Sequence, residues 1–403
     1  MLYQDFSTKL LGLQDTRITN VKKTDGILQI SAELNRKAHK CPSCGAETNT
    51  IHDYRTQIVK DIPAFGRFVQ IHLRKRRYRC SCGKRFIEKN PWLARYRRNT
   101  PRMTLAVIED LTDVCSYTKV AKKYALSVTT VQRIFDVVSY PKPSMPSVLA
   151  IDEFKGNTGG EKFNAILTDP ENRIVLDILP KRQGEYLSEY FTAISHKERK
   201  KTNFFVSDMW EPYVNSAAIY FHSATQIVDK YHWVRQCSLA MDEVRKQVQG
   251  HLDAEGRRLM KRSRYILLKH YDELSEKKKE RLKQLLLLSP TLNSAYYLKE
   301  QLYSITKECS VQTAIRDLSS WLMAAEASGL EAFVACAKTY HNWSRGICNS
   351  LRYPYTNGFT EGCNNKIKVL KRNAYGLKNF NRFRNRILHI FSKQKTNLLP
   401  TVV

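Results

Sequence analysis

The sequence VLAIDEFKGNTGGEKFNAILTDPENRIVLDIL, at residues 148–179, predicts the architecture of the central part of the chain. Three short apolar runs are separated by turns that contain Gly, Asp, Asn and Pro, which is typical of three successive β-strands. Residues 184–194 and 211–221 follow with helical patterns, and residues 203–208 and 225–230 are further strand-like runs. Strands joined by tight turns, followed by alternating helices and strands, predict a mixed α/β sheet.

Two carboxylates belong to these strands. Asp152 lies inside the apolar run 149–154, where a charged side chain faces a desolvation penalty unless it has a partner or a metal. Asp208 ends the apolar run 204–208, and ligands of open α/β sheets collect beyond the carboxyl ends of strands. For either acid alone, a strand-end turn or a salt bridge is the competing interpretation.

A third acid, Glu361, lies in the first turn of a predicted helix at residues 359–373, whose positive end favours an anionic group. One side of this helix is apolar and would dock on the sheet: Phe359, Cys363, Ile367 and Leu370. Polar and basic residues recur at helical spacing on the opposite side: Glu361, Asn365, Lys368 and Arg372. An acid at the head of such a stripe suits a metal site with DNA running away from it, so Asn365, Lys368 and Arg372 are predicted DNA contacts.

Together, Asp152, Asp208 and Glu361 predict a catalytic site for two Mg²⁺ or Mn²⁺ ions. Such ions need several carboxylate oxygens. Two ions held ~4 Å apart can activate a water or a 3′-hydroxyl and stabilise the leaving oxygen. The sequence contains no Walker A motif, no GxSxG elbow and no HExxH motif, so those reaction classes gain no support.

Four of the ten cysteines form two tight pairs, Cys41-Pro-Ser-Cys44-Gly and Cys80-Ser-Cys82-Gly. Zinc takes four soft donors in a tetrahedron, and each tight turn can present two thiolates. We therefore predict a closed, structural zinc site at Cys41, Cys44, Cys80 and Cys82; a metal-free thiol cluster is the alternative. The second pair is one residue shorter than the usual knuckle, and His52 and His72 are possible substitute ligands.

The segment between the cysteine pairs is strongly basic. Residues 74–79, RKRRYR, place basic side chains on both faces of a predicted strand. A solvated basic face is one interpretation, and contact with phosphates is the other. We predict that Arg74 and Arg76 contact DNA.

Residues 117–135 fit two helices joined by a tight turn, with Ser127 as the N-cap of the second helix. Seven residues fall where the two helices must pack together: Val120, Ala121, Tyr124, Leu126, Val128, Val131 and Ile134. Four polar residues of the second helix face outward and suit base edges and phosphates: Thr129, Thr130, Gln132 and Arg133. This pattern predicts a helix-turn-helix that binds DNA, although helical hairpins without a ligand pack in the same way.

The net charge also indicates a nucleic-acid partner. The 403 residues include 67 Lys and Arg against 38 Asp and Glu, a formal charge of +29, which fits a polyanion because each neutralised phosphate releases counterions. No stretch reaches the ~18 apolar residues of a spanning helix. The N-terminal sequence carries acids and lacks the apolar core of a signal peptide. We expect a cytoplasmic protein that contacts no membrane.

Residues 139–147, SYPKPSMPS, contain three prolines and mark a domain boundary. Beyond residue 231 the sequence is almost wholly helical as far as about residue 345. The expected organisation is a β-hairpin around Asp25-Gly26 and a zinc ribbon at 1–95, a helix-turn-helix module at 96–140, a linker at 141–147, a catalytic core at 148–230 and 356–395, and a helical insertion at 231–355.

These motifs resemble those of bacterial DDE insertion-sequence transposases of the ISL-three group. The resemblance is carried by CPSCG, RYRCSCGKRF, the helix-turn-helix, LAIDEF, VSDMWEPY and TNGFTEGCNNKIKVLKRNAYG, in this order over nearly the whole chain. It implies that Asp152, Asp208 and Glu361 are the metal-binding triad of a ribonuclease-H-like α/β core. It also implies an all-α insertion between Asp208 and Glu361, which lie 153 positions apart.

The sequence Asp229-Lys-Tyr-His232 resembles an Asp-x-x-His element of DDE transposases that have helical insertions. His232 could orient a phosphate or a scissile strand, or it could cap a helix; Asp229 and His232 are therefore supporting candidates. The chain departs from the family pattern at its shortened second knuckle and at Glu153, which lies beside Asp152 and could share or compete for metal.

The resulting hypothesis is a nucleoid-associated DNA transposase that binds terminal inverted repeats, cleaves the element ends and joins them to target DNA. Pairing two ends requires at least a homodimer in the active complex. A non-catalytic DNA-binding regulator derived from a transposase and a metal-dependent DNA nuclease are the alternatives.

Overall fold

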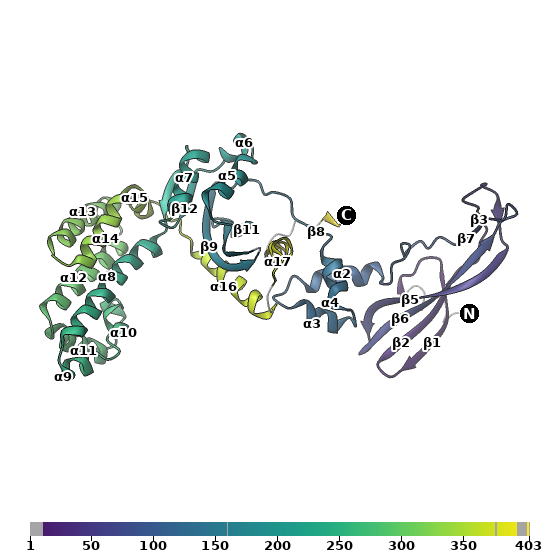
Figure 1. The fold of residues 1–403 in the computed structure, drawn as a ribbon, viewed down its shortest axis with the longest axis horizontal. Helices are drawn as coiled ribbons and strands as arrows, with labels where there is room; N and C mark the ends of the chain where they lie inside the picture. Colours follow the sequence, from purple (N-terminus) through teal and green to yellow (C-terminus); the bar gives the residue numbers. More distant parts are fainter. Residues whose placement is uncertain (1–10, 159, 375–376, 393–400, 403) are drawn as a thin grey trace. The chain divides into compact units, whose positions relative to one another are not determined.

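The computed structural model, drawn in Figure 1, describes residues 11–158, 160–374, 377–392 and 401–402. The chain divides into two compact units. The first unit comprises residues 1–140, 368–377 and 385–403, and the second comprises residues 141–367 and 378–384. The helices α16 (Gly358–Asn373) and α17 (Phe380–Ser392) therefore contribute residues to both units.

The first unit begins with an antiparallel hairpin of β1 (Thr16–Thr24) and β2 (Ile27–Leu34). Thr24 pairs with Ile27 across the turn, where Gly26 has φ +72°, so the hairpin predicted around this glycine is confirmed. The sheet runs in the order β1-β2-β6-β5, with β7 on β6, and β2 is parallel to β6. Its other strands are β5 (Ile51–Ala64), β6 (Arg67–Arg79) and β7 (Arg85–Ile87), and a separate short pair consists of β3 (His39–Lys40) and β4 (Glu47–Thr48).

Three helices follow in the same unit: α2 (Pro101–Asp110), α3 (Tyr117–Lys123) and α4 (Val128–Phe135). The three helices share one hydrophobic core, in which Val107 and Val131 are fully buried. The last part of α17 belongs to this unit, because Arg386 donates to the backbone oxygens of Asp113 and Cys115 at 3.2 and 2.9 Å. The short strands β8 (Val138–Ser139) and β14 (Thr401–Val402) pair antiparallel.

The second unit contains the α/β sheet predicted from residues 148–230. Its five strands lie in the order β11-β10-β9-β12-β13. The strands β9, β10 and β11 pair antiparallel, whereas β12 and β13 run parallel to β9. The elements, in chain order, are β9 (Val148–Thr158), β10 (Glu161–Asp169), β11 (Ile174–Leu179), α5 (Gly184–Thr192), α6 (His196–Arg199), β12 (Phe204–Ser207), α7 (Glu211–Tyr220) and β13 (Thr225–Val228).

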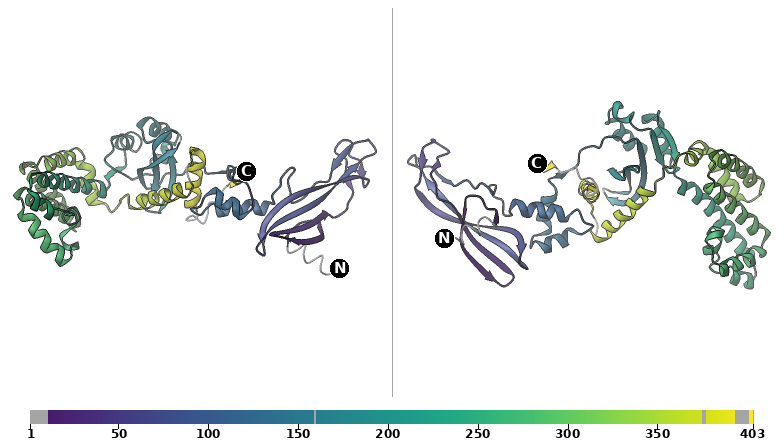
Figure 2. Two further views of the ribbon diagram at one scale, coloured as in Figure 1. Left: turned by 60° about the horizontal axis from the view of Figure 1, so that its bottom comes forward. Right: turned by 180° about the vertical axis from the view of Figure 1, so that it is seen from behind.

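Helices cover both faces of this sheet (Figure 2). On one face, alternate strand residues such as Ile151 and Phe205 pack against α5 and α7. On the other, Ala150 and Val206 form a smaller cluster with Ile227, and α16 is fixed by a 2.7 Å hydrogen bond between the hydroxyls of Thr168 and Thr360. Because side chains alternate along a strand, Asp152 shares the α16 face with Ala150.

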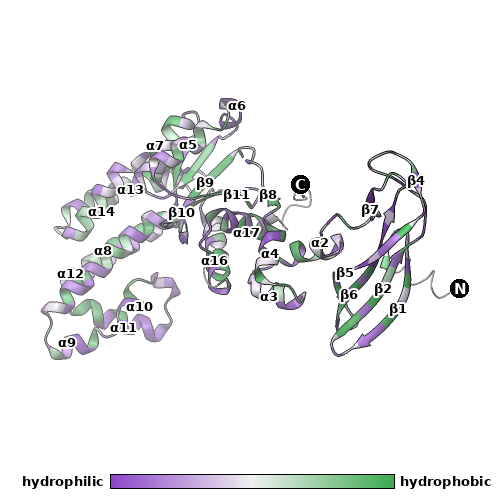
Figure 3. Ribbon diagram, turned by 45° about the vertical axis from the view of Figure 1, so that its right-hand side comes forward, coloured by the Kyte–Doolittle hydropathy of each residue, from purple (hydrophilic) through white to green (hydrophobic). Residues whose placement is uncertain are grey.

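The predicted helical insertion is also present, from α8 through α15, and it has a core of its own. Figure 3 shows its helices with hydrophobic and hydrophilic sides. Trp321 and Tyr340 are buried in this core, and their rings stack with centroids 5.3 Å apart. The helices are α8 (Lys230–His251), α9 (Ala254–Leu259), α10 (Arg264–Leu267), η1 (Tyr271–Glu273), α11 (Glu276–Leu287), α12 (Pro290–Lys307), α13 (Val311–Ala327), α14 (Glu331–Asn342) and α15 (Ser344–Arg352).

The two compact units are coarser than the expected domains, and the division between them also runs through residues 356–395. Residues 356–395 were expected to belong wholly to the catalytic core, but residues 368–377 and 385–403 group with the first unit. Residues 385–403 group with the first unit because polar side chains of α17 are buried in that unit. His389 hydrogen bonds to the backbone oxygen of Ile108 at 2.8 Å and contacts the ring of Phe135.

One glycine fixes how closely the insertion approaches the sheet. A Cβ added at Gly346 in α15 would lie 2.6 Å from Val228 Cγ2 and 3.4 Å from the Val228 backbone nitrogen, at the end of β13. We expect Gly346→Ala to lower the free energy of unfolding by about 1–3 kcal/mol, as overpacking does. The matched control is Gly250→Ala in α8, where a Cβ meets nothing within 4 Å and helix propensity predicts a gain of about 0.5–1 kcal/mol. Urea unfolding of both variants checks this; equal effects would contradict it.

Candidate functional site

Asp152 lies on β9 with only 8% of its surface exposed. Its Oδ1 accepts a hydrogen bond from the Glu153 backbone N–H at 2.8 Å, and its Oδ2 accepts from Asn364 Nδ2 at 2.9 Å. Burial, together with the charges of Glu153, Asp229 and Glu361, raises the pKa of this carboxyl to about 7, although the hydrogen bond from the Glu153 backbone opposes the rise. A nearby cation would lower this pKa and favour the ionised form.

Asp208 follows β12 directly, at the carboxyl end of that strand. Its Oδ1 is buried and has no hydrogen-bond partner in the described part of the chain. Burial raises the pKa of Asp208 to about 7; the charges of Glu153 and Asp152 add to the shift, and Arg182 opposes it. The two predicted strand carboxylates therefore lie within electrostatic reach of each other.

Asp229 and His232 are at the junction of β13 and α8. Asp229 is 3% exposed and accepts a hydrogen bond from the Asn357 backbone N–H at 2.8 Å. Burial raises its pKa, and the charge of Glu361 raises it further. His232 Nε2 lies 3.9 Å from Asp229 Oδ2. The predicted pair is thus adjacent in space and close to the third predicted acid.

Glu361 lies in the first turn of α16 and is exposed. Its charge acts on both Asp152 and Asp229, because it raises the pKa of each carboxyl. The apolar side of the helix is formed as predicted, with Cys363, Ile367 and Leu370 each 2% exposed or less; Phe359 is half-buried. The fold therefore gathers acids from β9, from the ends of β12 and β13, and from α16.

Two asparagines of the site were not foreseen. Asn364 donates to both Asp152 Oδ2 and the Glu153 backbone oxygen, at 2.9 and 3.2 Å. Asn357 donates its side-chain N–H to the Ile151 backbone oxygen at 3.2 Å, while its backbone N–H binds Asp229. Both lie in TNGFTEGCNN, and the position of Asn364 three residues after Glu361, one helical turn on, was the available signal.

The donor chemistry of this cluster fits hard divalent cations, which take carboxylate and amide oxygens. Beside the unpartnered Asp208 Oδ1, the side-chain oxygens of Asn357 and Asn364 are buried without a hydrogen-bond partner among the described residues. The carboxylate oxygens of these acids do not form one compact group of ligand atoms among the described residues. Among the described residues, one set of four cysteines is the only group of three or more acid, His or Cys residues whose ligand atoms all lie within 4.8 Å of one another.

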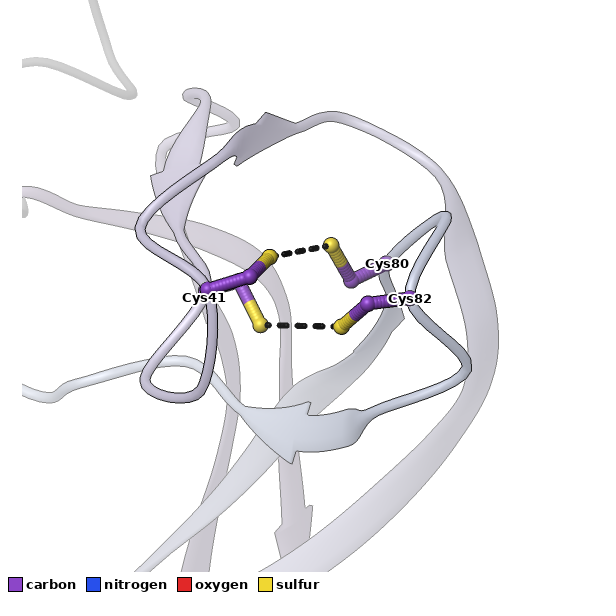
Figure 4. Close-up of side chains that lie close together, drawn as sticks. Cys41, Cys80 and Cys82 are labelled. Carbon is purple, nitrogen blue, oxygen red and sulfur yellow. Dashed lines mark hydrogen bonds between the residues drawn. The ribbon is translucent and has the colours of Figure 1, made fainter.

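That cysteine set is the predicted Cys41, Cys44, Cys80 and Cys82 (Figure 4). The sulfurs of Cys41 and Cys82 are 3.7 Å apart, and those of Cys44 and Cys80 are 3.5 Å apart. Hydrogen bonding from the Cys82 backbone lowers the pKa of the Cys80 thiol to about 6. The two predicted turn glycines have positive φ, at +75° for Gly45 and +84° for Gly83. Four converging sulfurs fit a structural zinc site without His52 or His72.

The predicted helix-turn-helix is formed by α3 and α4. The Ser127 hydroxyl accepts from the Thr130 backbone N–H at 3.1 Å, so the predicted N-cap is confirmed. Of the seven predicted packing residues, Val128 is wrong: it is 37% exposed because it begins α4 outside the helix contact. Thr129 and Arg133 are exposed, whereas Thr130 and Gln132 are half-buried.

Family comparisons decide the class of protein. Residues 149–387, more than half of the chain, match the DDE transposase domain of the ISL3 group. Residues 37–82 match the zinc finger of the transposases of IS204, IS1001, IS1096 and IS1165, and residues 88–137 match the helix-turn-helix domain of the ISL3 transposase family. The chain belongs to the ISL3 family of transposases.

Individual relatives agree with this family assignment. The transposase for insertion sequence element IS1001 of Bordetella parapertussis is 30% identical over 358 residues, which cover 87% of this chain and 88% of that protein. The transposase for IS1557 of Mycobacterium tuberculosis is 30% identical over 127 residues, 31% of this chain and 28% of its own. A Lactococcus lactis protein named an ATP-dependent protease is 34% identical over 100 residues, 25% of this chain and 31% of its own.

One predicted DNA contact of the ISL3 zinc-ribbon region is wrong. Arg76 is only 5% exposed. Its guanidinium lies 3.3 Å from Glu33 Oε2 and 3.4 Å from Glu88 Oε2, and it donates to the Leu34 backbone oxygen at 2.7 Å. The alternation of basic side chains along the strand was predicted, but the burial of Arg76 against Glu33 of β2 and Glu88 beyond β7 was not.

The other residues predicted to contact DNA outside the helix-turn-helix are accessible in this family member. Arg74 has a 55% exposed side chain and stacks on the ring of Tyr54 at 3.7 Å. Asn365, Lys368 and Arg372 are exposed on α16. None of the described helices is long and apolar enough to cross a membrane.

The raised pKa values of this transposase give it an unusual pH dependence. The carboxyls of Asp152 and Asp208 have pKa values of about 7 in the folded chain against about 4 in the unfolded chain. They bind protons more tightly when folded, so their contribution to stability without Mg²⁺ is greater at pH 5 than at pH 8. Each carboxyl lowers stability by up to about 1.4 kcal/mol per pH unit as pH rises from about 4 to 7. Asp208→Asn should remove the contribution of one of these carboxyls to the fall of stability with rising pH.

Thermal unfolding of zinc-loaded protein between pH 5 and 8 measures this. Mg²⁺ is removed by dialysis, because a chelator would also strip the zinc. The wild type minus Asp208→Asn difference isolates the carboxyl from all other titrating groups. A difference that stays constant over this range would contradict the prediction.

Proposed function

We propose that this transposase binds the terminal inverted repeats of its insertion sequence, cleaves the element ends and transfers them to target DNA, with Asp152, Asp208 and Glu361 as the catalytic residues. The observation that carries the proposal is the mutual electrostatic influence of acids that come from β9, β12, β13 and α16. The strand order, with three antiparallel strands and two parallel ones, supports a ribonuclease-H-like core.

The three acids would bind two Mg²⁺ ions through their carboxylate oxygens. When bound, such ions activate a water or 3′-hydroxyl and stabilise the leaving oxygen without a covalent enzyme intermediate. Asn364 orients Asp152 by donating to Oδ2, and the Glu153 backbone N–H donates to Oδ1. The Asn357 backbone N–H holds Asp229 in the same way. His232 lies beside Asp229 and is proposed to donate to a phosphate oxygen.

DNA recognition belongs to the N-terminal modules. Thr129 and Arg133 on the exposed side of α4 are proposed to read base edges and phosphates of the terminal repeat, with Thr130 and Gln132 beside them. Arg74 on the zinc-ribbon sheet and Asn365, Lys368 and Arg372 on α16 are proposed phosphate contacts. Two ends must be paired for transposition, so the active complex is proposed to be a homodimer.

An assay with labelled element-end duplex, a target plasmid and Mg²⁺ tests the proposal. The duplex carries the imperfect inverted repeat read from the DNA that flanks the coding sequence. Cleavage followed by joining supports the proposal. Binding alone would instead indicate a regulator, and cutting without joining a nuclease.

A further inference from the structure

Arg182 lies beside the acidic cluster and was not singled out by any sequence motif. Its Nη1 is 2.6 Å from Glu153 Oε2. Its Cζ lies 4.3 Å from the ring centroid of Trp210 and 4.6 Å from that of Phe163. Its charge acts on Asp208, where it opposes the rise in pKa caused by burial. A cation is therefore held beside Glu153, and its charge reaches the predicted catalytic carboxyl of Asp208.

Three separate segments fix this guanidinium. Glu153 comes from β9, Phe163 from β10 and Trp210 from the turn after Asp208, whereas Arg182 itself belongs to the loop between β11 and α5. Aromatic rings attract a guanidinium through their faces, so two rings restrict the position of its plane. Such restraint goes beyond what neutralisation of Glu153 requires, since a mobile cation would serve that purpose.

The guanidinium also retains donors for a ligand. It has five N–H groups in a planar fork, and its ion pair with Glu153 engages Nη1. The side chain is 24% exposed, so the fork is accessible at the edge of the cluster. A planar fork matches the oxygens of a phosphate diester, which is the group that the proposed reaction brings to Asp208.

We propose that Arg182, held between Phe163 and Trp210, is a phosphate-binding residue of the active site that receives a non-bridging oxygen of the DNA strand beside Asp208. Glu153 holds the guanidinium in position until DNA arrives, so its role is to orient Arg182 and not to bind metal. The inference rests on the proposed function, because it assigns a ligand group to the same site.

The electrostatics of the cluster explain why such a residue is needed. The charges of Glu153, Asp229 and Glu361 act on Asp152, and those of Asp152 and Glu153 act on Asp208, so five carboxyls are linked through Asp152. They repel a phosphate diester wherever bound cations do not offset them. A fixed arginine supplies a positive charge that needs no reorganisation when the strand binds.

The test compares R182Q and R182K with K181Q. Lys181 is a matched control: it is the preceding residue, its ion pair with Glu161 is 2.8 Å long, and its side chain is 28% exposed. The substrates are element-end duplexes in which one phosphate at a time across the cleavage site is replaced by a neutral methylphosphonate. Binding is measured with Ca²⁺ and single-turnover cleavage with Mg²⁺.

On the unmodified duplex we expect R182Q to cleave about 100-fold more slowly than wild type. R182K keeps a charge without the fork, so its loss should be smaller, about 10-fold, and K181Q should be unchanged. At one methylphosphonate position, wild type and R182Q should become equal, because the partner of the arginine is gone. A purely structural role for Arg182 would give the same loss at every position.

The outcomes separate the two proposals. If wild type cleaves and R182Q shows no loss, or the same loss at every position, the phosphate site is refuted and the proposed function stands. If wild type does not cleave, the proposed function fails, and the affinities measured with Ca²⁺ then test the phosphate site. Affinities of wild type and R182Q that become equal at a single methylphosphonate position support the site. An affinity difference that is the same at every position, or no difference, refutes it. If R182Q does not fold, R182K is read by the same criteria.

Discussion

Asp208→Asn is expected to lower the rate of end cleavage at least about 1,000-fold and to leave the affinity for the element-end duplex unchanged. Bound metal ions stabilise the transition state by several kcal/mol, and each 1.36 kcal/mol is a factor of ten in rate. Asparagine keeps the size of the side chain and removes its charge. Because the helix-turn-helix and zinc ribbon are proposed to bind the ends, binding should survive.

The same variant should be more stable than wild type without Mg²⁺ at pH 8. Burial and the charges of Glu153 and Asp152 hold the pKa of Asp208 at about 7, so its ionised form is unfavourable in the folded chain. Loss of activity together with a higher unfolding temperature rules out misfolding as the cause. Added Mg²⁺ should raise the unfolding temperature of wild type by mass action, and that of the variant less.

Glu211→Gln serves as the control, since Glu211 is an exposed acid three residues away at the start of α7. It should cleave at the wild-type rate. Gel-shift titration and single-turnover cleavage of a labelled end duplex provide both measurements. Strand transfer retained by Asp208→Asn would refute the assignment of Asp208 to the catalytic site.

The strands and helices of the core could be predicted because their signals are local. The runs at 148–154, 162–169 and 173–179 alternate with turn residues, and all three strands are present. The short helix α6 was missed, because four residues, His196–Arg199, carry too little periodicity. The order of the strands in the sheet depends on long-range pairing, which no local pattern encodes.

The site was predictable to the level of its acids and no further. Asp152 and Asp208 stand out because a carboxylate in an apolar strand is anomalous, whatever its partner. Arg182 does not stand out, because a lone arginine in a loop between two elements has no pattern around it. Its proximity to Glu153, Phe163 and Trp210 arises only when β10, β11 and β12 assemble into one sheet.

Arg76 illustrates the opposite error. Its place in RKRRYR made it one of several equivalent basic residues in the sequence. Glu33 of β2 and Glu88 beyond β7 convert it into a buried ion-pair partner, while its neighbour Arg74 stays exposed. Composition therefore predicted a basic surface, and only the packing of the sheet could say which arginines form it.

Cys80→Ser is the second variant with a large expected effect. It should abolish stoichiometric zinc binding and weaken the affinity for the element-end duplex at least about tenfold. A structural zinc site contributes on the order of 10–16 kcal/mol of binding free energy, and serine is a poor substitute for a thiolate ligand. Cys80 is 2% exposed and its sulfur is 3.5 Å from that of Cys44, so its loss opens the centre of the site.

The damage should be confined to one end of the first unit. The turns that carry the cysteines are bordered by the end of β6 and by the short strands β3, β4 and β7. The short strands cannot hold together without the metal. By contrast, the sheet β1-β2-β6-β5 has its own core, in which Val59, Ile71 and Leu73 are fully buried. Circular dichroism should therefore change little, while the affinity for DNA falls.

The control is Cys309→Ser, an exposed cysteine outside the zinc site, which should keep one zinc per chain and wild-type affinity. Zinc is measured by mass spectrometry of dialysed protein and affinity by gel shift. Retention of one zinc per chain by Cys80→Ser would contradict the four-cysteine site. Loss of zinc with unchanged end binding would show that the cysteine turns take no part in recognition.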